Sequence, residues 1–339
     1  MPFIQTIKQF HSVSIVGMAK NTGKTTCLNY VIRRLRDEGK AIALTSIGVD
    51  GEERDVLYDT PKPRITLDEG MVFVTSEQDF EQCEFPTEVL AVSERATALG
   101  RLITARAKGT GKVVLSGPSD SAWLQSTITA MSSYGVELTL VDGALSRMSL
   151  ASPAVTDAMI LCTGAACSPQ LPELIRRTKF RCNLIDLEQA DESLQRNLHP
   201  INSGVWTLNE TLNEWTKIGN SVFTLENLSN NSTEHLRTIY VCGAVTDHFF
   251  TLLNARKNHH IQLVVNDFTT LFVTPLTYDR FVSNGGQIKV LQKAKLLAVC
   301  TNPTSPEGAS LNPIALREQM QEALGVAVYD VVETERIRN

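Results

Sequence analysis

One stretch near the start of the chain constrains its fold more than any other. Residues 12–16 form a short, partly β-branched apolar run, and Leu28, Val31 and Leu35 recur at helical spacing further on. Between them lies a glycine-bounded loop that continues into Gly-Lys-Thr-Thr: Gly17, Met18, Ala19, Lys20, Asn21, Thr22, Gly23, Lys24, Thr25 and Thr26. A strand, such a loop and a helix in this order predict a phosphate-binding loop, with all ten residues as nucleotide contacts.

The expected chemistry of this loop follows from its backbone. A loop wrapped around a polyphosphate turns its amides inward, and the next helix directs its positive end at the same anion. Lys24 is expected to reach the β- and γ-phosphates, and the Thr25 hydroxyl to hold Mg²⁺. Gly109-Thr110-Gly111-Lys112 is an internal control, because the strand-like residues 113–115 follow it. We therefore predict an ordinary turn there.

The loop is one residue longer than the common motif, with five residues between Gly17 and Gly23 instead of four. This spacing resembles the dethiobiotin-synthetase-like branch of P-loop proteins, part of the larger group with signal-recognition, MinD-like and cobalamin-chaperone GTPases. Lys20 precedes Lys24 by four residues, whereas the signature lysine of MinD-like members needs five. That role is therefore not assigned to Lys20.

Three acidic residues are candidates for the remaining chemistry. Residues 138–141, which are apolar except for Thr139, lead directly into Asp142. This pattern is typical of a Walker B strand whose carboxylate holds Mg²⁺ directly or through water. Asp50 and Glu52 follow the predicted strand 41–47, at the edge where ligands gather in α/β sheets. The expected catalytic residues are Lys24, Asp142, Asp50 and Glu52, and the expected metal ligands are Thr25, Asp142 and Asp50. A plain acidic turn is the alternative for residues 48–53.

The composition limits the class of protein. The chain has 339 residues, 42% hydrophobic and 20% charged, which favours a globular protein of two domains. Its net charge of −5, without a basic stripe, argues against nucleic acid as a partner. We expect no membrane span, no signal peptide and a cytoplasmic location. The seven scattered cysteines include no Cys-x-x-Cys pair, so we expect buried free thiols, as at Cys162, Cys242 and Cys300, and no zinc site.

The predicted fold class is α/β, with a P-loop NTPase domain built on a mainly parallel sheet. This domain is expected over residues 1–185, with an inserted, mostly antiparallel β element at 59–116 in which 93–108 could instead be helical. A smaller α/β domain is expected over 186–339, with strands near 238–243, 261–266 and 296–301. No Asn-Lys-x-Asp follows the predicted strand 156–162, which favours ATP over GTP.

Several segments together resemble one family, the P-loop subunit encoded beside lysine 5,6-aminomutase and described as part of its reactivase. They are residues 20–26, 45–55, 62–65 and 141–144, with Asp157, Thr163-Gly164, Asn302-Pro303 and Ser305-Pro306. The resemblance implies an ATP-driven chaperone that removes damaged cobalamin from an adenosylcobalamin-dependent aminomutase. It also implies that mutase and a second reactivase subunit as partners.

Two other functions remain open at this point. One is a small-molecule enzyme similar to dethiobiotin synthetase, which uses ATP to activate a carboxylate and needs no protein partner. The other is a nucleotide-binding scaffold that hydrolyses nothing. A homodimer across the nucleotide face, common among relatives of this P-loop branch, is also an open alternative.

Overall fold

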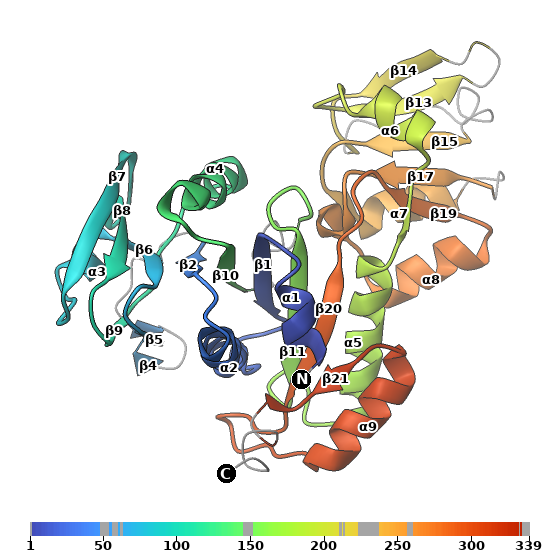
Figure 1. Ribbon diagram of the computed structural model, residues 1–339. Helices are drawn as coiled ribbons and strands as arrows, with labels where there is room; N and C mark the ends of the chain where they lie inside the picture. Colours follow the sequence, from blue (N-terminus) through green and yellow to red (C-terminus); the bar gives the residue numbers. More distant parts are fainter. Residues whose placement is uncertain are drawn as a thin grey trace. The chain divides into compact units, whose positions relative to one another are not determined.

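The computed structural model describes residues 2–47, 54–55, 60–61, 64–144, 152–209, 212, 214–222, 237–255, 260–331 and 333. The chain divides into two compact units. Unit 1 comprises Met1–Lys179 and Lys295–Asn339, and unit 2 comprises Phe180–Ala294. Figure 1 labels most of the elements of both units.

Unit 1 is built on a nine-stranded, mostly parallel sheet. Its strands, in spatial order, are β21 (Val328–Tyr329), β20 (Leu296–Asn302), β11 (Ala158–Gly164), β1 (Ser12–Gly17), β10 (Leu138–Ala144), β2 (Ile42–Ser46), β6 (Val72–Ser76), β8 (Gly100–Ala107) and β7 (Thr87–Thr97). Every pair from β21 to β6 is parallel, whereas β8 pairs antiparallel with both β6 and β7. The predicted α/β class with a mainly parallel sheet is confirmed.

Helices and smaller β elements complete unit 1. The helices are α1 (Pro2–Ile7), α2 (Lys24–Asp37), α3 (Glu77–Phe80), α4 (Ser121–Met131), η1 (Ser132–Tyr134), α9 (Pro313–Leu324) and α5 (Leu171–Ile185), which runs past the division between the units. Two short antiparallel pairs join β3 (Arg54–Asp55) to β4 (Thr60–Pro61) and β5 (Ile65–Leu67) to β9 (Gly111–Val113).

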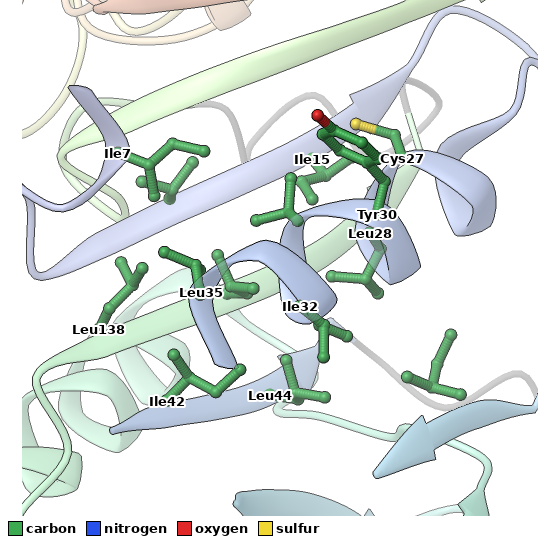
Figure 2. Close-up of a cluster of buried hydrophobic side chains, with 14 of the residues drawn as sticks. Ile7, Ile15, Cys27, Leu28, Tyr30, Ile32, Leu35, Ile42, Leu44 and Leu138 are labelled. Carbon is green, nitrogen blue, oxygen red and sulfur yellow. The ribbon is translucent and has the colours of Figure 1, made fainter. Parts of the chain in front are cut away.

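Strand alternation places α2 and α4 against different side chains of the sheet. Ile42 and Leu44 of β2 pack in the same buried cluster as Leu28 and Leu35 of α2 (Figure 2). The residue between the two, Ala43, belongs to another cluster with Met131 of α4. Because successive residues of a strand point to opposite faces, the two helices cover opposite faces of the sheet. Both helices thus pack on the same sheet of unit 1.

The β element predicted at residues 59–116 is mostly antiparallel, as expected, but its longest strands belong to the main sheet. Residues 93–108 fall in β7, β8 and the turn between them, so the helical alternative is wrong. β6 pairs in parallel with β2, and β8 and β7 continue the same sheet antiparallel to it. These strands extend the main sheet because the apolar side chains of β6 and β8 are buried with those of β2.

Unit 2 carries a six-stranded sheet of its own. Its strands, in order, are β12 (Glu188–Gln189), β19 (Gln287–Val290), β17 (Gln262–Val265), β15 (Thr238–Val241), β13 (Val205–Asn209) and β14 (Glu214–Gly219). A two-stranded sheet joins β16 (Val245–Thr246) to β18 (Leu271–Phe272). The helices are α6 (Glu192–Leu198), α7 (Asp247–Asn254), η5 (Phe268–Thr270) and α8 (Pro275–Ser283).

The expected C-terminal domain of residues 186–339 needs correction. β20 pairs in parallel with β11, with Gly164 opposite Asn302, so residues 295–339 return to unit 1. The strand expected near 296–301 therefore belongs to the large sheet, together with the helix α9. Unit 2 is an excursion of the chain between β11 and β20.

The cysteines are free thiols in both units. Cys162 and Cys300 are buried as expected, and Cys27 is buried beside Cys300, with 3.5 Å between the two Sγ atoms. Cys242 is only partly buried, which corrects the expectation for that residue, because it follows β15 instead of lying inside the strand.

Candidate functional site

The glycine-bounded loop lies at the carboxyl edge of the parallel strands of unit 1. Gly17 ends β1, which lies between β10 and β11, and it is level with Ala144 on one side and Cys162 on the other. The Met18 amide donates to the Cys162 carbonyl at 2.8 Å, which ties the start of the loop to β11. Ligands of open α/β sheets bind at this edge.

Left-handed backbone conformations shape the loop. Asn21 has φ 60°, and among the described residues it is the only non-glycine with a positive φ. Gly23 has φ 85°. The Thr22 hydroxyl donates to the Ala19 carbonyl at 3.0 Å, and this contact closes the loop on itself. Left-handed residues beside right-handed ones turn successive amides toward a common side, the arrangement known as an anion-binding nest.

The N-terminus of α2 is open. Gly23 occupies the N-cap position and offers no side-chain oxygen to the first amides, and the first turn carries no acidic residue. The first regular helical bond runs from the Cys27 amide to the Gly23 carbonyl at 2.9 Å. The amides of Lys24, Thr25 and Thr26 precede that bond, at the positive end of the helix dipole. This end of α2 suits an external anion.

The Lys24 side chain folds back over the start of the loop. A Cβ added to Gly17 would lie 2.7 Å from Lys24 Cδ and 2.5 Å from the Thr22 Oγ1. Only glycine leaves room for the lysine stem in this position. The aliphatic part of the Lys24 side chain therefore lies against the start of the loop.

Asp142 lies beside this loop on the neighbouring strand. Its Oδ1 is buried and has no hydrogen-bond partner among the described residues, although the residue as a whole is partly exposed. Burial raises the pKa of this carboxyl group, and the positive charge of Lys24 acts in the opposite direction. The Ser46 hydroxyl donates to the Asp142 backbone carbonyl at 3.1 Å and fixes the strand there. The structure thus brings the predicted residues Lys24 and Asp142 together.

The chemistry of these groups fits a hard cation next to a polyphosphate. The buried Asp142 carboxylate oxygen, which has no partner among the described residues, is the type of oxygen donor that Mg²⁺ takes. The described residues contain no group of three or more His, Cys, Asp or Glu side chains arranged to hold a metal ion. Such a cation would therefore depend on few protein ligands, as is usual for Mg²⁺ beside phosphates.

The other predicted acidic residues, Asp50 and Glu52, lie outside the described residues. Of the segment 62–65 that carries part of the resemblance, Lys62 and Pro63 also lie outside them. Arg64 is described and is exposed. The assignment of Asp50 as a metal ligand, and of Asp50 and Glu52 as catalytic residues, stays a prediction.

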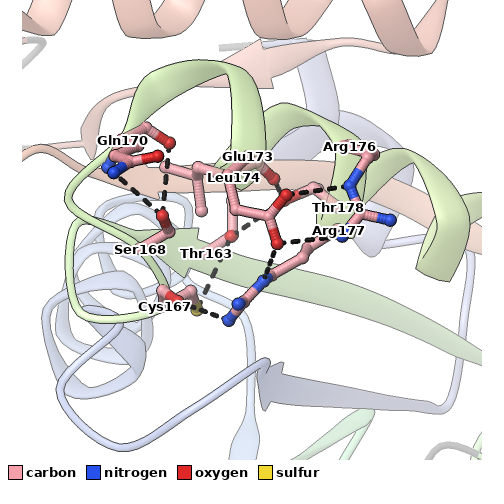
Figure 3. A network of polar contacts seen from close by, with 9 residues as sticks. All are labelled: Thr163, Cys167, Ser168, Gln170, Glu173, Leu174, Arg176, Arg177 and Thr178. Carbon is pink, nitrogen blue, oxygen red and sulfur yellow. Dashed lines mark hydrogen bonds and ion pairs between the residues drawn. The ribbon is translucent and has the colours of Figure 1, made fainter.

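The neighbouring strand end at Gly164 is anchored by a polar network (Figure 3). The hydroxyls of Thr163 and Thr178 lie 3.0 Å apart and join the end of β11 to α5. On α5, Glu173 accepts hydrogen bonds from Arg176 and Arg177, which lower its pKa to about 2. The Glu173 pairs lie within α5, whereas the Arg177 guanidinium donates to the Cys167 carbonyl at 2.9 Å and ties α5 to the turn that follows β11.

Sequence reasoning missed one residue of this site, Asn302 at the end of β20. Its Nδ2 donates to the Asn21 carbonyl at 3.2 Å, and its Cβ would lie 3.1 Å from a Cβ added to Gly23. The sequence pattern includes Asn302-Pro303 among the segments that resemble the reactivase subunit, but it gives Asn302 no role of its own. The missing information was that β20 pairs with β11, which local patterns do not reveal.

Within the part of the chain that the structure describes, no helix has both the length and the apolar composition to cross a membrane. Comparisons with protein-family models, with curated proteins and with solved structures gave no match for this chain.

Proposed function

We propose that this chain is a P-loop nucleoside triphosphatase that binds Mg-ATP. The observation that supports the proposal most is one juxtaposition at the edge of the sheet. An uncapped helix N-terminus with Lys24 folded over Gly17 lies beside Asp142, a carboxylate with a buried oxygen that has no partner among the described residues. A polyphosphate with a divalent cation would satisfy both the amides and the carboxylate.

The proposal assigns separate roles to the loop amides, to Lys24, and to the pair Thr25 and Asp142. The amides around Gly23 and the first turn of α2 bind the β- and γ-phosphates, and Lys24 neutralises the charge that develops on them. Thr25 and Asp142 would hold Mg²⁺, which would supply positive charge to offset the negative charge of the phosphates. ATP is favoured over GTP by the absence of Asn-Lys-x-Asp from the sequence after β11.

The partner in this proposal is an adenosylcobalamin-dependent aminomutase of the lysine 5,6-aminomutase type. It is supported by the resemblance of the loop, of residues 141–144 and of Asn302-Pro303 to the P-loop reactivase subunit. A chaperone of this kind must have different affinities for the mutase in its two nucleotide states, since otherwise hydrolysis could not drive release of the damaged cofactor. Unit 2 would provide the surface for the partner.

The test is nucleotide turnover by the purified chain with Mg-ATP and Mg-GTP, alone and with the inactivated aminomutase. We expect slow ATP hydrolysis that accelerates when the inactivated mutase is added. Hydrolysis that ignores the mutase would contradict the chaperone role and favour a small-molecule kinase acting on carboxylates. Binding of Mg-ATP without any ADP formed would favour the non-hydrolysing scaffold.

The matched variants are Lys24→Ala and Lys112→Ala, because both lysines follow a Gly-x-Gly or glycine-bounded sequence. Lys24→Ala should lower kcat by about 100-fold or more, since the lysine charge acts on the transferring phosphoryl group. Lys112 is exposed on β9, so its removal should leave kcat and KM unchanged. Equal hydrolysis by the two variants would show that the site lies elsewhere.

A further inference from the structure

Asn302, at the end of β20, reaches the glycine-bounded loop with its side chain. It lies 281 positions from Asn21 in the sequence and reaches the loop because β20 pairs with β11, whose neighbour is β1. The strand end itself is fixed, since the Ala165 amide donates to the Asn302 carbonyl at 2.9 Å. A Cβ at Gly164 would overlap this carbonyl, so the two strand ends approach closely.

The orientation of the Asn302 amide is determined by its neighbour. The Thr304 backbone amide and hydroxyl donate to Asn302 Oδ1 at 3.2 and 3.1 Å. Because a backbone N–H can only donate, it must face the oxygen of the side-chain amide, which leaves Nδ2 for the Asn21 carbonyl. Thr304 therefore aims the donor of Asn302 at the loop.

Asn302 bonds to one and lies close to the other of the two loop residues that have a left-handed backbone conformation. Asn21 is left-handed without being glycine, and Gly23 is left-handed at the helix N-cap. Asparagine adopts the left-handed region more readily than most residues with a side chain, but the conformation still costs more than it does for glycine, so contacts that fix it favour it. A hydrogen bond to the carbonyl of one and a side-chain contact at the other fix both together.

We infer that Asn302 is a positioning residue that holds residues 18–23 in the anion-binding conformation before the ligand arrives. The inference rests on the proposed nucleotide-binding function and adds a residue to it. Asn302 acts through the backbone of Asn21 and Gly23 and takes no part in phosphoryl transfer. Its loss should therefore weaken binding and leave the chemical step nearly intact, in contrast to the loss of Lys24.

The test uses the isosteric variant Asn302→Asp and the truncated variant Asn302→Ala in the full chain. Both lack the donor for the Asn21 carbonyl, so KM for Mg-ATP should rise about tenfold, as one lost hydrogen bond allows, with kcat changed less than about twofold. Asn302→Asp should be the worse of the two, because its carboxylate would face a carbonyl and the phosphates. A fall in kcat at unchanged KM would overturn the positioning role.

A matched control separates binding from stability. Asn312 accepts from the Ala315 amide at 3.0 Å and caps α9 in the same C-terminal segment, away from the loop contacts given above. Asn312→Ala should lower the melting temperature and leave KM unchanged. If Asn312→Ala raised KM as much as Asn302→Ala, a general loss of stability would explain the effect and the inference would be wrong.

Hydrogen exchange without nucleotide tests the inference independently of the proposed function. The peptide that covers residues 18–26 should exchange faster in Asn302→Ala than in the unmodified chain, while β10 and β2 should not change. Unchanged exchange in this peptide would overturn the positioning role. Faster exchange, in a chain that binds no nucleotide, would retain the role of Asn302 and reject the proposed function.

Discussion

The helices α2 and α4 begin in opposite ways, although both belong to unit 1. At α4, Asp120 accepts from the Trp123 amide at 2.8 Å and from Arg95 at 2.6 Å, and these contacts lower its pKa. At α2, the N-cap is Gly23, no acidic residue stands in the first turn, and Lys24 adds a positive charge. The chain supplies its own anion to one helix and leaves the other positive.

This difference indicates which of the two helix N-termini is free to bind an external anion. A helix N-terminus gains stability from a negative charge, so α4 is complete without any ligand. α2 combines positive amides and a lysine, and the nearby Asp142 carboxylate is itself buried and short of partners. Such an arrangement is costly in an isolated chain and becomes favourable when an anion and a cation arrive together. Variants at the two helix N-termini and at Asp142 should therefore differ in their effects on activity and on stability.

The largest expected effect comes from filling the space under Lys24. Gly17→Ala would place a Cβ 2.5 Å from Thr22 Oγ1 and 2.7 Å from Lys24 Cδ, so the loop and the lysine must both shift. Displacement of such groups by about 1 Å costs on the order of 100-fold in activity. We expect that loss in kcat/KM for Mg-ATP, measured by steady-state hydrolysis.

Gly39→Ala is the control for this variant. Gly39 has φ 71° and open space around its Cβ position, so the substitution strains the end of α2 without touching the loop. It should lower the free energy of unfolding by roughly 1–2 kcal/mol and leave kcat/KM unchanged. Equal loss of activity in both variants would mean that α2 stability alone, and not its open N-terminus, limits activity.

Asp142→Asn should have the next largest effect and should separate function from stability. We expect hydrolysis to fall about 100-fold, since the carboxylate charge for the cation is lost. The apo protein should nevertheless melt at a higher temperature than the unmodified chain at neutral pH, because a buried carboxylate with a poor set of partners has been neutralised. A lower melting temperature would show that the carboxylate is a structural group.

The pH dependence of this stability difference has a definite sign. Burial raises the pKa of Asp142 above its value in the unfolded chain, so the folded state binds the proton more tightly. The stability that this provides is complete below the unfolded pKa of about 3.9 and is lost as pH rises through the folded pKa. The advantage of Asp142→Asn should therefore vanish toward pH 4 and grow toward neutral pH in melting curves.

Part of this site was predictable from local sequence, because the signals were local. The predicted order of strand, loop and helix around Gly17–Lys24 is confirmed. The turn predicted at residues 109–112 is only partly correct, because Gly111 and Lys112 lie in β9, although no helix follows them directly. Gly111 serves a different purpose, since a Cβ there would overlap the Phe85 ring while β9 pairs with β5. The same Gly-Lys pair therefore has different roles at residues 23–24, where a helix follows, and at residues 111–112, which lie in a strand.

The remainder was not predictable because it depends on which strands pair. Hydrophobic runs identify β20 as a strand, but they do not say that it returns to β11 after the whole of unit 2. The domain boundary and the contact of Asn302 with Asn21 both follow from that one pairing. The same limit made residues 59–116 look like an insertion, although β6, β8 and β7 extend the main sheet.

The smallest expected effect comes from opening the closed helix. Asp120→Ala removes the cap of α4 and the partner of Arg95, whose guanidinium also lies 4.3 Å from the Trp123 ring centroid. The melting temperature should fall by a few degrees with no change in hydrolysis. Because the pKa of Asp120 is lowered in the folded state, its stabilising effect is present above the unfolded pKa and is lost as pH falls through the folded value. The melting temperatures of the unmodified chain and Asp120→Ala should therefore converge as the pH falls, and a difference that grew in acid would contradict this prediction. A change in nucleotide affinity in Asp120→Ala would contradict the contrast between the two helices.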